Sequence, residues 1–575
     1  MTESTSAIPP AATAPPRRRA WRDRLPHWPL WLGLAFMAML IGYPVALLIL
    51  NSLFPHALEG DWRGFGGAYL RIFQTEGVAA MLGNSLRWAM ATTGGAWLLG
   101  IPCGYLLART NLRGKSFARL LMVVPIMTPP YICAISYILM MQPGGFADMA
   151  FGPMPAALRA TFFGFWGVTF VMAISSFGYV ALGVEAGLRG ISSRLDDAAA
   201  GLGATRFQRW RMVTLPLLLP ALLNTGLLVF LEAMSNFGVP ATLGSRANLP
   251  LLPAEIYYLV TTWPVDLPLA TALSTVLLFV AVISLMTSKR LLRRFQQVSG
   301  RSVATQEKPL GRWGQIAGWS FITLVTCFSI GVPYVVMVLT SLVKRWGGGL
   351  PTLTFHHYVQ VFSPGSRGLS ALTTSLILSL SAATICAVLG GFIAYAITRH
   401  RGWLASLLDA ASLLPRVLPK IVMAVALIMA WNAPWVRVHI YGTIWILLLA
   451  YVALYLSDAL RYGDTAMRQI AQRLEHAAES LGAAPWRVFV SITLPMLRPA
   501  LIAAWVTTFI VCMRDLVASV ILLPPGTETT GSFIFNQFEQ GDISVAMAMA
   551  TVTILLSTAV LLLLQYSQGR FQQRP

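Results

Sequence analysis

The sequence predicts an all-α membrane protein with twelve transmembrane helices, arranged as two parallel repeats of six helices each. Hydrophobic residues make up 56% of the chain and charged residues only 11%, which is too apolar for a soluble protein of several domains. Mostly apolar runs that reach the ~20 residues needed to cross a bilayer recur along the whole chain. The second half also repeats motifs of the first, and an even number of spans per copy makes the two copies run in the same direction.

The predicted spans follow one another with mostly short connections. In order they lie roughly at 28–53, 79–108, 117–141, 160–187, 213–240, 265–288, 315–343, 368–398, 403–431, 438–460, 492–523 and 544–566. On this basis the chain divides into a basic tail at 1–27, a first repeat at 28–288, a linker at 289–314, a second repeat at 315–566 and a short tail at 567–575.

The net charge of +20 reflects how basic residues are distributed about the membrane. In the first half they gather in the segments on one side of the predicted spans, and the opposite side holds only Arg63, Arg71, Arg159 and Arg246. Because cytoplasmic loops carry an excess of Lys and Arg, this asymmetry predicts that both termini are cytoplasmic. It also argues against a single basic patch for nucleic acid, which leaves the lipid bilayer as the partner that the composition indicates.

Two segments 279 residues apart carry the most specific signal. The first repeated loop, 194–222, reads RLDDAAAGLGATRFQRWRMVTLPLLLPAL, and the second repeated loop, 473–501, reads RLEHAAESLGAAPWRVFVSITLPMLRPAL. Leu and Ala recur at i, i+3, i+4 and i+7 in each copy, which predicts one apolar stripe on a short helix. A glycine then ends the helix, and a Leu-Pro pair opens the next span. The stripe and its glycine are Leu195, Ala198, Ala199, Leu202 and Gly203 in the first loop, and Leu474, Ala477, Ala478, Leu481 and Gly482 in the second.

The repeat extends beyond these two loops. Positions of the second and third spans recur at a spacing of 290 residues, among them Gly100 as Gly390 and Arg109 as Arg399. The spacing falls to 279 at the loops because the connection after the third span is shorter in the second half. The polar, basic linker has the composition of a segment that joins two once-separate subunits. Kinks or helix starts are predicted at the paired prolines Pro129, Pro130, Pro216, Pro220, Pro415, Pro419, Pro495 and Pro499.

The two loops resemble the EAA loop of the permeases of type I, binding-protein-dependent ATP-binding cassette (ABC) importers, and the resemblance covers nearly the whole chain. In that family the loop forms a coupling helix that docks on a soluble ATPase. The resemblance therefore implies the type I ABC importer permease fold and a place in the cell inner membrane. It also implies two copies of an ATPase subunit, which bind ATP with Mg²⁺, and a periplasmic solute-binding protein. We expect the permease itself to bind no cofactor or metal ion.

The resemblance assigns ATPase coupling to one set of residues in the two loops. They are Leu195, Asp197, Ala198, Ala199, Leu202, Gly203, Leu474, Glu475, Ala477, Ala478, Leu481 and Gly482. The family's loop opens with Glu-Ala-Ala, whereas Asp196-Asp197 and Glu475-His476 precede the alanines here. Each loop therefore still has an acidic residue ahead of its alanines. An amphipathic helix on the lipid surface is the alternative. The identical Ala-Ala-x-x-Leu-Gly-Ala in both halves argues against that alternative.

No motif for catalysis is present in the sequence. It lacks the G-x-x-x-x-G-K-[ST] loop that cradles nucleotide phosphates, the H-E-x-x-H metalloprotease motif and the nucleophile elbow. The five cysteines fall within predicted spans without C-x-x-C spacing, which argues against a disulfide or a thiolate metal site. We therefore expect a transport subunit, with ATP hydrolysis on a separate ATPase subunit.

Charged residues within the spans are candidates for function, because each costs about 2.5–3.5 kcal/mol at the bilayer centre on insertion scales and usually faces a cavity. Glu232 and Asn236 are predicted on one face of the fifth span, and Arg514 and Asp515 lie in the equivalent eleventh span. We predict that these four residues line the translocation pathway. A polar network between packed helices is the alternative. A structural role is at least as well supported for Glu185, Asp409, Lys420 and Asp458.

The segments around the fifth and eleventh spans bear on the transported solute. SNFGVPATLG (235–244) and LLPPGTETTGSFIFNQFEQGD (522–542) resemble the corresponding segments of ferric iron permeases. Ferric iron is therefore the expected solute, and thiamine, 2-aminoethylphosphonate and polyamine permeases are close relatives that stay as alternatives. Outside this class, an ion-coupled secondary transporter or a lipid-modifying membrane enzyme would also carry intramembrane charges. The paired loops disfavour the first, and the scattered histidines disfavour the second.

Overall fold

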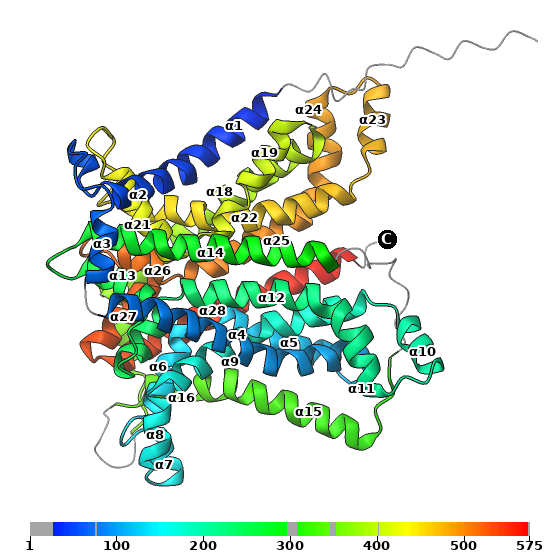
Figure 1. Ribbon diagram of the computed structural model, residues 1–575, viewed down its shortest axis with the longest axis horizontal. Coiled ribbons are helices and arrows are strands. Elements are labelled where there is room, and N and C mark those ends of the chain that lie inside the picture. The colour runs from blue at the N-terminus through cyan, green and yellow to red at the C-terminus, as the bar shows by residue number, and fades with distance from the viewer. Residues whose placement is uncertain (1–26, 75–76, 296–306, 345–351, 401, 573–575) are drawn as a thin grey trace, which may run out of the picture.

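The computed structural model describes residues 27–74, 77–295, 307–344, 352–400 and 402–572 (Figure 1). Nearly all regular structure in this part of the chain is helical, and it contains no strand, only two isolated backbone bridges. The α-helices of the first half are α1 Trp28–Met37, α2 Tyr43–Leu53, α3 Gly67–Gln74, α4 Val78–Arg109, α5 Lys115–Met127, α6 Pro130–Met141, α7 Phe146–Phe151, α8 Ala156–Phe162, α9 Phe165–Arg189, α10 Ser193–Gly201, α11 Arg206–Arg209, α12 Leu215–Ser235, α13 Leu252–Thr261 and α14 Leu267–Phe295.

The second half repeats this order of spans, without counterparts of α7 and α8. Its α-helices are α15 Arg312–Thr326, α16 Val332–Leu342, α17 His356–Phe362, α18 Arg367–Arg399, α19 Trp403–Ala411, α20 Leu414–Val417, α21 Lys420–Trp431, α22 Ile444–Gln469, α23 Gln472–Ser480, α24 Pro485–Val488, α25 Leu494–Met513, α26 Val517–Leu522, α27 Thr530–Gln540 and α28 Ile543–Gln572. Short π-helical turns and one 3₁₀ turn join some of them, namely η2 Ala38–Gly42, η3 Ala57–Glu59, η4 Trp210–Thr214, η5 Pro240–Gly244, η7 Cys327–Gly331 and η8 Phe489–Thr493. The predicted amino-terminal tail and the middle of the predicted linker lie outside the described residues.

Helices stand at all twelve predicted spans. In the described part of the chain, nine are long and apolar enough to cross a membrane, or eleven if each of two bent pairs is one span. The bent pairs are α5 with α6, at 90°, and the segment 403–417 with α21, at 108°. The remaining predicted span corresponds to α4, which has 32 residues and a more polar middle that includes Thr92 and Thr93. The all-α prediction is therefore confirmed.

Prolines mark both bends, as the paired prolines predicted. Pro129 and Pro130 open α6, and Pro419 precedes α21. The fifth and eleventh spans, predicted as continuous, are instead broken at equivalent places. α12 ends at Ser235 and α25 ends at Met513, and a short helix follows each of them. Apolar residues continue on both sides of the polar pairs Ser235-Asn236 and Arg514-Asp515 at these breaks, so the hydropathy pattern did not reveal them.

The opening span of each half packs against the other half. α1 lies against α18 and α19, and α2 lies against α21 (Figure 1). In the same way α15 lies against α4 and α5, and α16 lies against α6. Each opening span also packs on the last span of its own half, α2 on α14 and α16 on α28. The two repeats are therefore interlocked, and neither buries its spans alone.

Repeated glycines let the central helices of each half approach closely. α4 packs on α9, and α18 packs on α22. A Cβ atom on Gly100 would lie 2.8 Å from the carbonyl oxygen of Phe177, and one on Gly390 would lie 2.9 Å from the backbone nitrogen of Leu460. Small residues at such contacts allow the backbone-to-backbone packing typical of membrane helices. The pair Gly100 and Gly390, found from the repeat, thus has the same packing role in both halves.

Candidate functional site

The two repeated loops project from the same end of the helical bundle, where α10 and α23 lie outside the spans (Figure 1). Each begins with a nine-residue helix, α10 or α23. A turn, a four-residue helix and a π turn then lead without interruption into the long helix α12 or α25. The predicted short helices are confirmed, and their backbone architecture is the same in both halves.

A glycine in the left-handed conformation ends each short helix. The φ angle is +81° at Gly203 and +87° at Gly482. The next residue closes the turn, because the N–H of Ala204 donates to the carbonyl of Ala199 at 3.0 Å, and the N–H of Ala483 donates to that of Ala478 at 3.1 Å. These are the hydrogen bonds of a Schellman motif, in which glycine avoids the strain that a Cβ atom would cause. The prediction that Gly203 and Gly482 end the helices is confirmed.

The apolar stripe of each short helix is turned to the outside. Leu202 and Leu481 have exposed fractions of 90% and 89%, and Leu195 and Leu474 are 46% exposed. Ala198 and its equivalent Ala477 are exposed as well, and Ala199 and Ala478 are half-buried. Large aliphatic side chains exposed outside the spans, at matching positions of two loops, form a surface that a protein partner can cover.

The second loop is fixed to the bundle by a buried ion pair. Glu475 and Arg399 are 2% and 1% exposed. Arg399 Nη2 donates to Glu475 Oε1 at 2.8 Å, and its Nε lies 2.8 Å from Oε2. The hydroxyl of Thr493 donates to Oε1 at 2.8 Å. The carboxylate of Glu475 therefore connects α23 with the end of α18 and with the turn that precedes α25.

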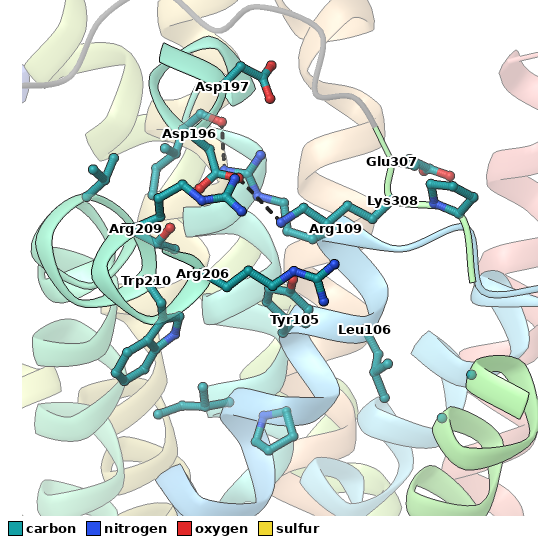
Figure 2. Close-up of a pocket in the computed structure, with 18 of the residues that line it drawn as sticks. Tyr105, Leu106, Arg109, Asp196, Asp197, Arg206, Arg209, Trp210, Glu307 and Lys308 are labelled. Atoms are coloured by element: carbon teal, nitrogen blue, oxygen red, sulfur yellow. Dashed lines mark hydrogen bonds and ion pairs between the residues drawn. The ribbon is translucent and has the colours of Figure 1, made fainter. Parts of the chain in front are cut away.

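The first loop has a different anchor at the equivalent place. Asp196, which is half-buried, is the equivalent of Glu475. Its Oδ2 lies 3.1 Å from Arg209 Nη1 and 3.4 Å from Lys308 Nζ (Figure 2). Arg109, the equivalent of Arg399, instead donates from Nη2 to the carbonyl of Ile191 at 3.0 Å. Asp197, placed in the predicted coupling set, is exposed, whereas Asp196 is half-buried; both line the same cavity.

The four predicted pathway residues come together at the junction between the halves. Glu232, Asn236, Arg514 and Asp515 all line one cavity of about 50 Å³. Pro129, Pro130 and Tyr131 at the first bend and Lys420 at the second bend complete its polar and proline-rich wall. Among the described residues, no group of three or more His, Cys, Asp and Glu side chains is arranged to hold a metal ion. The cavity therefore offers charges of both signs rather than a ligand cage.

Asn236 and Asp515 occupy equivalent positions and have the same local contact. Asn236 Oδ1 accepts the N–H of Val239 at 2.9 Å, and Asp515 Oδ2 accepts the N–H of Ala518 at 2.9 Å. Each thus caps the short helix that follows the break, as Asn and Asp side chains do at helix starts. Asn236 is the C-cap residue directly after α12, and it lines the same cavity as Glu232, which agrees with the prediction that the two residues share one face.

One further contact of the junction joins the two halves, and others lie within the second half. Arg514 Nη1 donates to the carbonyl of Ile126 at 2.7 Å, which ties the end of α25 to the end of α5. The Tyr455 hydroxyl donates to Asp515 Oδ1 at 2.9 Å, and Lys420 Nζ lies 5.8 Å from the centre of the Tyr455 ring. These contacts agree with a polar network between helices as well as with a pathway, so both predicted alternatives have support in the geometry.

Two of the charges assigned to structural roles have structural partners. Glu185 Oε1 lies 2.6 Å from Arg119 and 2.8 Å from Arg189. Asp409 Oδ1 accepts from Arg461 at 2.8 Å. These ion pairs agree with the structural alternative for both acids.

Sequence reasoning missed several polar residues of these sites. Tyr455 and Thr493 bear no charge, and Lys420 was assigned to a structural role although it lines the junction cavity. Arg399 was found as a repeated residue, but nothing assigned it a partner. The recurrence of Arg109 as Arg399 marks this position as repeated, but it does not identify Glu475 as the partner.

Two interlocked repeats of six helices, each with a proline-marked bend and each with an exposed helical loop at the same end, define a multi-pass membrane protein of the transporter class. The chain belongs to the family of the binding-protein-dependent transport system inner membrane component, which matches residues 100–297 and 387–575. One match falls in each half. The protein is therefore the permease subunit of a binding-protein-dependent ABC importer, a transport subunit by family.

Curated relatives span one or both halves. The chain is 28% identical to the ferric transport system permease protein FbpB of Actinobacillus pleuropneumoniae over 474 residues, 80% of this chain and 66% of that one. It is 24% identical to the Fe(3+)-transport system permease protein FbpB 2 of Haemophilus influenzae over 546 residues, 93% of this chain and 98% of that one. It is 26% identical to the putative 2-aminoethylphosphonate transport system permease protein PhnV of Salmonella paratyphi A over 244 residues, 42% of this chain and 91% of that one.

A bacterial ABC transporter that imports the acidic polysaccharide alginate is similar in solved structure. One of its chains matches 44% of this chain and 95% of its own length, at 17% identity and a TM-score of 0.36. This likeness is too weak to support a further argument.

Proposed function

We propose that this permease imports ferric iron. The supporting observation is the length of one match: similarity to a ferric permease of Haemophilus influenzae covers 93% of this chain and 98% of that protein. Such a match includes both repeats, both loops and the linker region. The predicted resemblance of segments 235–244 and 522–542 to ferric permeases points the same way.

The partners in this proposal are those of an ABC importer. Two copies of an ATPase subunit, which bind ATP with Mg²⁺, dock on the exposed stripes of α10 and α23, and a periplasmic binding protein delivers the solute at the opposite end. The loops and both termini then lie in the cytoplasm of a cell whose inner membrane holds the permease. The exposed Leu202 and Leu481 support this assignment, since a docked partner would bury them.

The translocation pathway in this proposal runs through the junction of the two halves. Closure of the ATPase pair pulls the two loops together, and the long helices α12 and α25 carry that motion to the breaks at Asn236 and Asp515. The cavity there contains Glu232, Arg514 and Lys420. A ferric ion and the anions bound to it would therefore find both negative and positive side chains in the wall. The small volume of about 50 Å³ supports a closed state of the pathway.

Import of 2-aminoethylphosphonate is the second candidate. The supporting observation is the match to PhnV relatives, which covers 91% of one such protein but only 42% of this chain. A relative of that length corresponds to one half of this permease. The match therefore supports a shared ancestry of the halves more than a shared solute.

Uptake in a deletion strain separates the two solutes. We expect radiolabelled ferric iron uptake under iron limitation to fall when the gene is deleted and to return with the wild-type gene but not with a Leu202→Asp, Leu481→Asp variant. Labelled 2-aminoethylphosphonate uptake serves as the parallel measurement. Normal iron uptake in the deletion strain would exclude the ferric proposal, and a selective loss of phosphonate uptake would favour the second candidate.

Docking of the ATPase is tested by co-purification. We expect Leu202→Asp and Leu481→Asp together to abolish retention of the ATPase subunit, because an aspartate would be buried at the interface. Leu158→Asp on α8, which replaces a leucine that is 49% exposed at the other end of the bundle, is the matched control. Retention of the ATPase by the double variant would exclude the stripes as the docking surface.

A further inference from the structure

A cavity of about 750 Å³ lies between the end of α4, the first repeated loop and the residues that precede α15 (Figure 2). The cationic side chains that line it are Arg109, Arg206, Arg209 and Lys308. The apolar part of its wall includes Ile101, Leu106, Val213 and Phe321. The span α4 ends here and the span Arg206–Ser235 begins here, so the cavity lies at the level where lipid headgroups meet the protein.

Three acidic side chains, Asp196, Asp197 and Glu307, line the cavity beside the four cationic ones, so the wall keeps an excess of one positive charge. Asp196 is shared between Arg209, at 3.1 Å, and Lys308, at 3.4 Å. Glu307 is engaged by Lys115, whose Nζ lies 2.5 Å from Oε1. The Nε atom of Arg209 is buried and makes no hydrogen bond within the described part of the chain. An oxyanion in the cavity would give this donor and its neighbours an acceptor.

The second half indicates where such an oxyanion would lie. There the carboxylate of Glu475 accepts from Arg399 and from Thr493, and it fills the space between the two side chains. The equivalents Arg109 and Thr214 both line the cavity of the first half. The acid of the first loop is one methylene shorter and turns toward another arginine. The first half therefore retains the cationic and hydroxyl donors of a carboxylate site without the carboxylate that fills it in the second.

We propose that this cavity binds the phosphate group of an anionic phospholipid. Arginine recognises phosphate through paired N–H donors, and basic pockets between spans hold anionic headgroups. A volume of about 750 Å³ exceeds what a phosphate needs and accommodates a headgroup with its glycerol, while the apolar wall contacts the upper acyl chain. The bound phosphate then joins the end of α4 to the first loop, as Glu475 joins α18 to the second.

The consequence is an asymmetric requirement for lipid. The second loop carries its own anion and is fixed to the bundle in any bilayer. The first loop is fixed only when an anionic headgroup occupies the cavity. This inference concerns a site of the permease itself and does not depend on the solute.

Lipid binding is measured by native mass spectrometry of the full chain, released from phosphatidylcholine nanodiscs to which phosphatidylglycerol is added. We expect retained phosphatidylglycerol in the wild type and a loss of about fivefold in affinity for each of Arg206→Gln and Lys308→Gln, since a basic residue near an anionic surface contributes about that factor. Arg211→Gln is the matched control, because Arg211 lies on the same loop and is not part of the cavity wall. Equal losses in all three variants would exclude the cavity as the site.

Asp196→Glu tests the same site without removing a cation. The longer acid is expected to reach Arg109 as Glu475 reaches Arg399, and therefore to displace the phospholipid while the chain stays folded. Undiminished phosphatidylglycerol binding in this variant would overturn the proposal.

A separate measurement distinguishes a phospholipid from a soluble phosphate compound as the ligand. Inorganic phosphate added to the protein in phosphatidylcholine nanodiscs should not raise the unfolding temperature, whereas phosphatidylglycerol should raise it. Stabilisation by inorganic phosphate alone, lost in Arg206→Gln and kept in Arg211→Gln, would exclude the lipid and identify a soluble phosphate compound as the ligand.

Discussion

The two repeated loops have the same backbone, but their inner faces differ: one holds a buried ion pair and the other lines an open basic cavity. In the second loop a glutamate, an arginine and a threonine close on one another in a dry site. In the first loop an aspartate at the same position leaves its arginine on a carbonyl and opens a basic cavity of about 750 Å³. The comparison teaches that duplication preserves the helix, turn and glycine geometry, while one methylene in an acidic side chain decides whether the loop is closed by the protein or left open.

Because they differ in burial, the ion pair of Glu475 and the ion pairs of Asp196 contribute unequally to the free energy of unfolding. Arg399 and Glu475 have both lost their water, so each depends on the other for its hydrogen bonds. The anchor of Asp196 keeps more solvent, since the side chains of Asp196, Arg209 and Lys308 are 21%, 18% and 56% exposed. Ion pairs of the second kind contribute about 1 kcal/mol or less. The two loops therefore differ in how much they lose when one acid is neutralised.

The largest effect is expected from neutralising these two acids separately. Glu475→Gln should destabilise the protein by about 3–5 kcal/mol, because it leaves Arg399 as a buried charge without a counter-ion. Asp196→Asn should cost about 1 kcal/mol or less. Thermal unfolding of both variants in nanodiscs of the same composition measures the difference.

The conservative change Glu475→Asp sharpens this comparison. It should give the second loop the shorter acid of the first and fall between wild type and Glu475→Gln in unfolding temperature. If Glu475→Gln and Asp196→Asn lowered the unfolding temperature equally, the distinction between a closed and an open anchor would be wrong.

The next largest effect is expected at the glycines that end α10 and α23. Valine at Gly203 or Gly482 should cost about 1 kcal/mol or more, because both φ angles are positive and a β-branched residue resists that conformation. Apart from the neighbouring residues in the chain, no atom of the described residues lies within 4 Å of a Cβ placed at either position, so the cost is backbone strain. Because the second loop is held by its buried pair and cannot shift, Gly482→Val should impair transport more than Gly203→Val.

Co-purification of the ATPase and solute uptake report these losses. Gly201→Ala is the matched control, since Gly201 lies in α10 with ordinary φ and open space around it and alanine favours the helix. Full coupling in the Gly203→Val, Gly482→Val double variant would reassign the loops to the lipid surface, the alternative that the sequence left open.

Much of the fold could be predicted because it depends on local signals. Apolar runs gave the spans, the repeat gave the two halves, and glycine gave the ends of the loop helices. The breaks after Ser235 and Met513 were missed because apolar residues continue on both sides of them. The exchange of opening spans between the halves was missed because no pattern within a span states which neighbour it packs on.

The site was predicted in part. Residues marked by their local sequence were found, whereas contacts between residues far apart in the chain were not. Glu232, Arg514 and Asp515 were found because a charge in a span is rare, and they do meet in one cavity. The partnership of Arg399 with Glu475 joins residues 76 positions apart, and nothing in either local sequence specifies it. Whether a repeated acid is buried depends on side-chain length and on the packing around it, which the repeat alone does not encode.

A smaller effect is expected from the equivalent caps Asn236 and Asp515. Asp515→Asn keeps an acceptor for the N–H of Ala518 and removes the charge, and its amide N–H₂ can donate to the Tyr455 hydroxyl, so it should leave stability nearly unchanged. Asp515→Ala also removes the cap and should cost about 1 kcal/mol more. Unfolding temperature separates these two variants.

Transport separates the pathway from the packing alternative at the same position. If Asp515 serves the pathway, Asp515→Asn should reduce solute uptake although the protein stays as stable as the wild type. Asn236→Asp is the reciprocal control, which adds a charge at the equivalent cap. Normal uptake in an Asp515→Asn, Glu232→Gln double variant would assign both acids to helix packing.

The smallest effect is expected in the connection after the third span, where the first half has the short helices α7 and α8 and the second half has a brief loop. The carboxylate of Asp148 accepts backbone N–H groups of Met154, at 2.9 Å, and Gly144, at 2.8 Å, and pairs with Arg159 at 2.8 Å. These hydrogen bonds, with the arginine as a further cause, lower the pKa of Asp148 below its ordinary value of 3.8. The carboxylate therefore stabilises the connection at all pH values above that ordinary pKa.

The sign of the pH dependence follows from that lowered pKa. Stabilisation is fully present above pH 3.8, and it is lost as the pH falls through the lower pKa of the folded state, where Asp148 takes up a proton. The hydrogen-exchange protection factors of residues 143–163 should be unchanged from neutral pH down to that value and should then fall, relative to those of residues 432–443 of the same sample. Asp148→Asn should expose the connection at every pH and remove the transition. A connection that loosened instead as the pH rose would mean that the carboxylate is held in its protonated form, contrary to the contacts that surround it.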